Sequence, residues 1–150
     1  MMRVDIRETL NGLIGLCKDS EATFAYCARR SRSFALHVML QRRALDCRRA
    51  GMHLQQLMAQ HGGMPRESGT AAGDLRLSWV AVRGALSAQP DLVLIDACER
   101  TDTLAELHYD HLLRATLPDS VRQLVEGQRD TIRHDRARLQ DLRERLRTTV

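Results

Sequence analysis

GGMPRESGTAAG, residues 62–73, separates a long region of helical spacing from a shorter one and continues neither of them. It contains four glycines and one proline, the residue types that destabilise and end helices. Short loops make consecutive helices antiparallel, whereas a long connection allows the helices before and after it to run parallel. The segment therefore predicts a helical bundle with a crossover connection.

Apolar residues spaced three and four apart predict two long helices before this connection. The first is expected over about residues 5–30, with Asp5 and Glu8 at the spacing of a capping box. The second starts at a cap formed by Ser31 or Ser33 and ends at about residue 61. Its inward stripe is expected at Leu36, Met39, Arg43, Asp46, Ala50, His53 and Leu57.

The rest of the chain predicts a short helix and two more long ones. The crossover over residues 62–89 contains the short helix, and residues 90–146 form the third and fourth long helices. Pro90 and Pro118 mark the starts of those two helices. The helical spacing of the short helix is carried by Leu75, Trp79, Val82 and Leu86. No alternating strand pattern occurs, so we expect an all-α chain with a single domain over residues 1–150.

Three carboxylates share one face of the third long helix. At about 100° per residue, Glu99, Asp102 and Glu106 fall within roughly 60° of one another. Their neighbours on that face are Leu92, Ile95, Tyr109 and Leu113. Unpaired charge in an apolar interior is very unfavourable, so a metal ion, a buried base or bound protons must accompany these acids.

Charge is unevenly distributed along a chain whose net charge is +4. Residues 29–49 hold seven arginines and one aspartate, whereas residues 91–111 hold six acids and one arginine. The two regions could attract each other inside the fold, but we favour the interpretation that most of these arginines solvate an exposed helix face. Aromatic residues make up only 3% of the chain, which makes nucleic-acid binding unlikely.

Cysteine spacing and hydropathy predict the cellular location of the protein. The four cysteines lack the short paired spacings of zinc or redox motifs, which favours reduced thiols. The sequence starts without an apolar run typical of a signal peptide, and no stretch approaches the roughly 18 apolar residues of a membrane span. We therefore expect a soluble, cytoplasmic protein without a membrane partner.

Several short motifs in the crossover point to a known family. They are Gly62-Gly63-Met64-Pro65, Ser68-Gly69-Thr70, Gly73 and Trp79. Supporting matches are Leu10-Asn11, Lys18-Asp19, Glu21, Arg42-Arg43-Ala44, Cys98-Glu99-Arg100 and Leu117-Pro118. With these residues the chain resembles an uncharacterised bacterial ferritin-like four-helix-bundle family, domain of unknown function 2383. The resemblance implies a ferritin-like four-helix bundle with a short extra helix between the second and third long helices.

The resemblance also implies a metal centre, for iron or manganese. Di-iron and di-manganese bundles use one glutamate from each of two helices and a Glu-x-x-His pair from each of the other two. The candidate metal ligands in this chain are Glu21, Asp46, His53, Glu99 and Asp102. The chain departs from the pattern, because it has no Glu-x-x-His, it has Arg49 and His53 in place of second-helix glutamates, and it has Arg136 in place of a histidine.

An arginine could supply the positive charge that the buried acids need, in place of a metal ion. Arg43 or Arg49 could pair with Glu21. An arginine could neutralise Asp102 in the same way, because a guanidinium acts electrostatically as a cation would. For His53 we favour an ordinary hydrogen-bonded histidine over a ligand. An arginine head group between the acids would indicate a salt-bridged core, whereas convergence of the acids without one would indicate metal.

Two classes of function follow. We favour a non-enzymatic, stress-associated structural or interaction protein with a degenerate metal site, which forms homo-oligomers or binds a partner. The alternative is an iron- or manganese-binding oxidase, peroxidase or iron-handling protein that uses the five candidate ligands. A weaker hypothesis is that the arginines of residues 29–49 bind an anionic surface.

Overall fold

The computed structural model describes residues 6–148, and within them all regular structure is helical. The helices are α1 (Ile6–Arg30), α2 (Phe34–Gln60), α3 (Ala71–Leu86), α4 (Pro90–Leu113) and α5 (Asp119–Thr148). The predicted all-α fold, with four long helices and a short one, is confirmed. Asp5, and with it the predicted capping box, lies outside the described residues. No helix between residues 6 and 148 is both long and apolar enough to cross a membrane.

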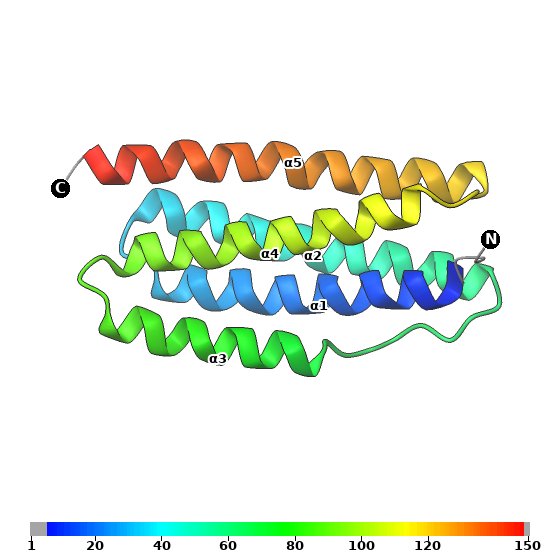
Figure 1. Cartoon of the computed structure of the whole chain (residues 1–150), viewed down its shortest axis with the longest axis horizontal. Coiled ribbons are helices and arrows are strands. Elements are labelled where there is room, and N and C mark those ends of the chain that lie inside the picture. Colours follow the sequence, from blue (N-terminus) through cyan, green and yellow to red (C-terminus); the bar gives the residue numbers. More distant parts are fainter. Residues whose placement is uncertain (1–5, 149–150) are drawn as a thin grey trace.

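The four long helices lie side by side in a bundle, and α3 lies along its edge (Figure 1). Contacts join α1 to α2, α1 to α4, α4 to α5 and, more sparsely, α2 to α5. Figure 1 shows that α2 and α4 point in the same direction, opposite to α1 and α5, so each of these contacting pairs is antiparallel. The crossover therefore has the topological effect predicted from its length.

The apolar core consists of two separate clusters. The first is built around Leu13, Leu54 and Leu112, and the second around Phe24, Leu40 and Leu139. Between them along the helices lies a buried polar layer. Its members are Asp19, Ser20, Thr23, Arg43, Asp102 and Asp135, from α1, α2, α4 and α5. The long helices therefore pack through two apolar regions that enclose a charged centre.

Side chains of α1 and α2 hold the crossover in place. Asp19 accepts hydrogen bonds from the backbone N–H of Thr70 at 2.8 Å and from its hydroxyl at 2.6 Å. Asn11 accepts from the Arg66 backbone N–H at 2.9 Å, and Gln55 donates to the Arg66 carbonyl at 2.8 Å. Thr70 in turn caps α3 by accepting from the backbone N–H of Gly73. These contacts explain how an extended segment without secondary structure is fixed to the bundle.

Candidate functional site

Arg43 lies at the centre of the buried polar layer. Its guanidinium donates to both carboxylate oxygens of Asp102, from Nη1 to Oδ2 at 3.0 Å and from Nη2 to Oδ1 at 2.7 Å. Both residues are almost fully buried, with 3% and 2% exposed. The guanidinium also lies 4.4 Å from the ring centroid of Phe24 on α1, which adds a cation–π contact. This bidentate geometry is the strongest form of the arginine–carboxylate interaction, and it joins α2 to α4.

Asp135 of α5 completes the central cluster. Its Oδ2 lies 3.4 Å from Nε of Arg43, and its Oδ1 accepts a hydrogen bond from Arg42 at 3.0 Å. Arg42 also lies 3.6 Å from Asp46, one turn along α2. We call Arg42, Arg43, Asp102 and Asp135 the central ion cluster. It connects α2 with both α4 and α5.

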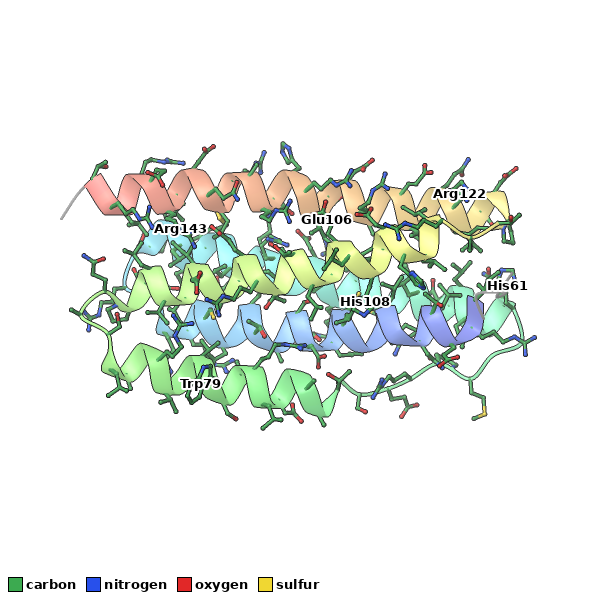
Figure 2. All side chains as sticks on the ribbon, viewed as in Figure 1. His61, Trp79, Glu106, His108, Arg122 and Arg143 are labelled. Carbon is green, nitrogen blue, oxygen red and sulfur yellow. The ribbon has the colours of Figure 1, made fainter. Side chains whose placement is uncertain are left out.

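The two other carboxylates of the α4 face meet arginines of α5. Glu106 is paired with Arg133 and, at 2.6 Å, with Arg136, while Glu99 lies 3.1 Å from Arg143. Figure 2 shows Glu106 and Arg143 in the seam between α4 and α5. All three predicted acids on α4 are therefore accompanied by arginine. Only Asp102 is fully buried, because Glu99 and Glu106 lie at the margin of the core.

Burial and pairing act in opposite directions on the central charges. Burial raises the pKa of Asp102, and the hydrogen bonds from Arg43 oppose this rise. For Arg43, burial by itself lowers the pKa, but its hydrogen bonds and charge interaction with Asp102 raise it further than burial lowers it. Burial also raises the pKa of Glu99, against the attraction of Arg143. Arg43 therefore remains charged in the core.

The structure does not gather the five predicted metal ligands. No three His, Cys, Asp or Glu side chains among residues 6–148 are grouped so that they could hold a metal ion. Each of the four predicted carboxylates faces an arginine instead. The pairs are Glu21 with Arg48 at 3.9 Å, Asp46 with Arg42, Glu99 with Arg143, and Asp102 with Arg43. His53 is exposed on α2.

Sequence reasoning identified part of the central ion cluster. Arg43 pairs with Asp102, as the arginine alternative predicts for that acid, whereas Glu21 pairs with Arg48 and not with Arg43 or Arg49. The role of Asp135 was missed, although a lone acid in the apolar stripe of α5 was the available signal. Arg136, which stands where the resemblance leads one to expect a histidine, pairs with Glu106.

Cys17 and Cys98 are buried thiols that do not supply reactive thiolates. Burial raises the pKa of Cys17 to about 11, and burial likewise raises the pKa of Cys98 well above its ordinary value. The thiolate is the form that attacks electrophiles and binds metals. Near neutral pH these two side chains therefore act as small apolar core residues.

A comparison with models of protein families identifies the family of this chain. The model of the family described as "domain of unknown function (DUF2383)" matches residues 5–115. The matched region contains α1 to α4 and ends before α5, which supplies Asp135 and the arginines that meet Glu99 and Glu106. A comparison with curated proteins found no match. Since the family model covers well over half of the chain, the protein belongs to this family of domains of unknown function.

Proposed function

We propose that the protein is a non-enzymatic, ferritin-like bundle that serves as a structural and interaction protein, with an arginine where a metal centre would lie. The position of the Arg43 guanidinium, between Asp102 and Asp135, carries this proposal. Arginine is a permanent cation with five donors and no acceptor, so it neutralises carboxylates without redox chemistry. Its function is then to hold α2, α4 and α5 together.

The residues present do not fit a bound iron or manganese ion. Such a centre needs several carboxylate and imidazole groups that converge on one point. Here Arg42 and Arg43 occupy that region, and their positive charges would repel a metal ion. A metal-dependent oxidase, peroxidase or iron-handling role requires the candidate carboxylates to leave these arginines and approach one another.

The interaction surface that we propose is an apolar ridge on α3. The α3 ridge consists of Leu75, Trp79, Val82 and Leu86, whose side chains are all exposed. Their spacing of four, three and four residues is the a/d pattern of a coiled-coil seam. Trp79, labelled in Figure 2, is 64% exposed although α3 lies against the bundle. A contiguous apolar strip of this kind is typical of an interaction site.

A second copy of the chain is the partner that suits the α3 ridge. A heptad-spaced seam is complementary to itself, which is what a two-fold interface requires. The arginines of α3 do not oppose such pairing, because they are paired within their own chain. Arg76 lies 3.7 Å from Asp19, and Arg83 lies 3.5 Å from Asp96. Two antiparallel α3 helices would therefore meet through apolar side chains.

Trp79→Glu tests this self-association. Wild-type protein is expected to form dimers in the micromolar range, and the substitution is expected to weaken dimerisation by about 30-fold or more, as for a buried aromatic hot spot. Analytical ultracentrifugation measures the dissociation constant. Because Trp79 is the chain's one tryptophan, its emission in the wild type should also shift to shorter wavelength as dimers form.

Leu107→Glu provides the matched control, because Leu107 is 62% exposed on α4, away from the ridge. This variant should dimerise like the wild type. A wild-type protein that stays monomeric throughout the micromolar range would contradict the proposed interaction. So would equal effects of the two substitutions.

A further inference from the structure

A groove opens beside the central ion cluster, between α2 and α5. Its volume is about 510 Å³, within the range of small-molecule sites. We call it the central groove. Its apolar lining includes Leu16, Cys17, Ala50, Ala105, Leu124 and Ile132. Asp46, Asp102 and Asp135 bring carboxylates to the same space, together with Arg43 and Arg49.

Small residues keep the central groove open. Ala50 of α2, Ala105 of α4 and Gly127 of α5 line it where larger side chains would fill it. A Cβ added at Gly127 would meet no atom within 4 Å. The α2 and α5 helices also make fewer contacts than the other neighbouring long helices. The small side chains and the sparse contact between α2 and α5 together leave the groove unfilled.

Most of the deep polar groups of the central groove already have protein partners. The Tyr109 hydroxyl donates to Gln128 at 2.6 Å, and the Gln128 amide donates to the Ala50 carbonyl at 3.2 Å. Asp135 Oδ2 differs, because it is buried and accepts no hydrogen bond, although Arg43 Nε lies 3.4 Å away. The Asp135 side chain is only 4% exposed and lines the groove. A buried acceptor that has an ion-pair partner but no hydrogen bond favours a ligand that donates one.

The charges around the central groove favour a neutral ligand. Three aspartates, Asp46, Asp102 and Asp135, line it with two arginines, Arg43 and Arg49. Arg42, which contacts two of these aspartates, brings the number of positive charges to three. With the charges balanced, neither an ammonium nor a carboxylate head group gains a net attraction. A hydroxyl satisfies the acceptor without adding charge.

We propose that the central groove binds a small neutral molecule with an apolar body and one hydroxyl group, and that the hydroxyl donates to Asp135 Oδ2. The apolar body lies against the alanines, leucines and isoleucine of α1, α2, α4 and α5. This site is separate from the α3 ridge, so binding here does not depend on self-association.

Three probes with the same ring system test the inference: 2-naphthol, naphthalene and 2-naphthoate. Isothermal titration calorimetry should show one 2-naphthol bound per chain. Naphthalene should bind about tenfold more weakly, which corresponds to one lost hydrogen bond. The carboxylate of 2-naphthoate, which donates no hydrogen bond and would face Asp135, should bind more weakly still. Amide chemical-shift changes on 2-naphthol addition should concentrate at groove residues.

Gly127→Leu should close the central groove and weaken 2-naphthol binding at least tenfold. Gly12→Leu is the matched control, because Gly12 is also a helical glycine with nothing within 4 Å of an added Cβ, and it does not line the groove. The control should bind like the wild type. The inference is overturned if 2-naphthol does not bind, if both variants bind it equally, or if 2-naphthoate binds most tightly.

Discussion

Arg43→Leu is expected to lower the free energy of unfolding by about 3–5 kcal/mol, the usual effect of breaking a buried ion pair. The substitution removes both of the donors that Arg43 directs at the carboxylate oxygens of Asp102, a side chain that is only 2% exposed. It also removes the Nε group near Asp135. Urea unfolding followed by far-ultraviolet circular dichroism measures the change.

Two further variants separate the central ion pair from an ordinary surface pair. The double variant Arg43→Leu, Asp102→Leu should regain much of the lost stability, because the charge of Asp102 is removed as well and Asp135 keeps its hydrogen bond from Arg42. Arg48→Leu breaks the exposed pair with Glu21 and should change stability by less than about 1 kcal/mol. A single variant Arg43→Leu as stable as Arg48→Leu would show that the ion cluster does not hold the core together.

Gly73→Ala is expected to destabilise the protein by about 2–3 kcal/mol through overpacking. A Cβ at this position would lie 2.6 Å from Oδ2 of Asp19 and closer still to its other carboxyl atoms. The carboxylate has little room to move, because Asp19 is buried and holds both the backbone and the hydroxyl of Thr70. The crossover would have to shift away from α1. Urea unfolding again measures the loss.

Gly84→Ala is the matched control on the same helix, since a Cβ there meets nothing within 4 Å. Alanine is the better helix former, so this variant should gain about 0.5–1 kcal/mol. In an Asp19→Ala background, the loss caused by Gly73→Ala should shrink, because the clashing carboxylate is gone. Equal effects of Gly73→Ala and Gly84→Ala would refute the close approach of the crossover to Asp19.

The helices and the crossover were predictable because they depend on local rules. Glycine and proline at residues 62–73 end α2, and apolar periodicity locates the long helices. The inward face of α2 was less predictable. His53 was expected inside but is exposed, whereas Gly51 and Leu54 are buried and Ala50 is partly buried against the core. Gly51 lies so close to α1 that an added Cβ would be 3.3 Å from Cys17 Cβ, a packing role that apolar periodicity does not reveal.

The charged centre was predictable only in outline. Acids on the inward face of α4 showed that a counter-charge was needed, and Arg43 was one of the candidates for it. Which arginine meets which acid depends on how helices distant in sequence are rotated against one another. Asp102 and Asp135 are both contacted by Arg43, although they belong to different helices. Periodicity within one helix cannot supply this information. The groove between α2 and α5 also depends on how distant helices pack, so periodicity could not predict it either.

Crystals grown with manganese(II) would test the central claim most directly. The claim is that Arg43 occupies the place of a metal centre. Anomalous diffraction should then show no manganese peak among Glu21, Asp46, His53, Glu99 and Asp102, and the density should place the Arg43 guanidinium between Asp102 and Asp135. A manganese peak coordinated by these candidate ligands, with Arg43 displaced, would contradict the account.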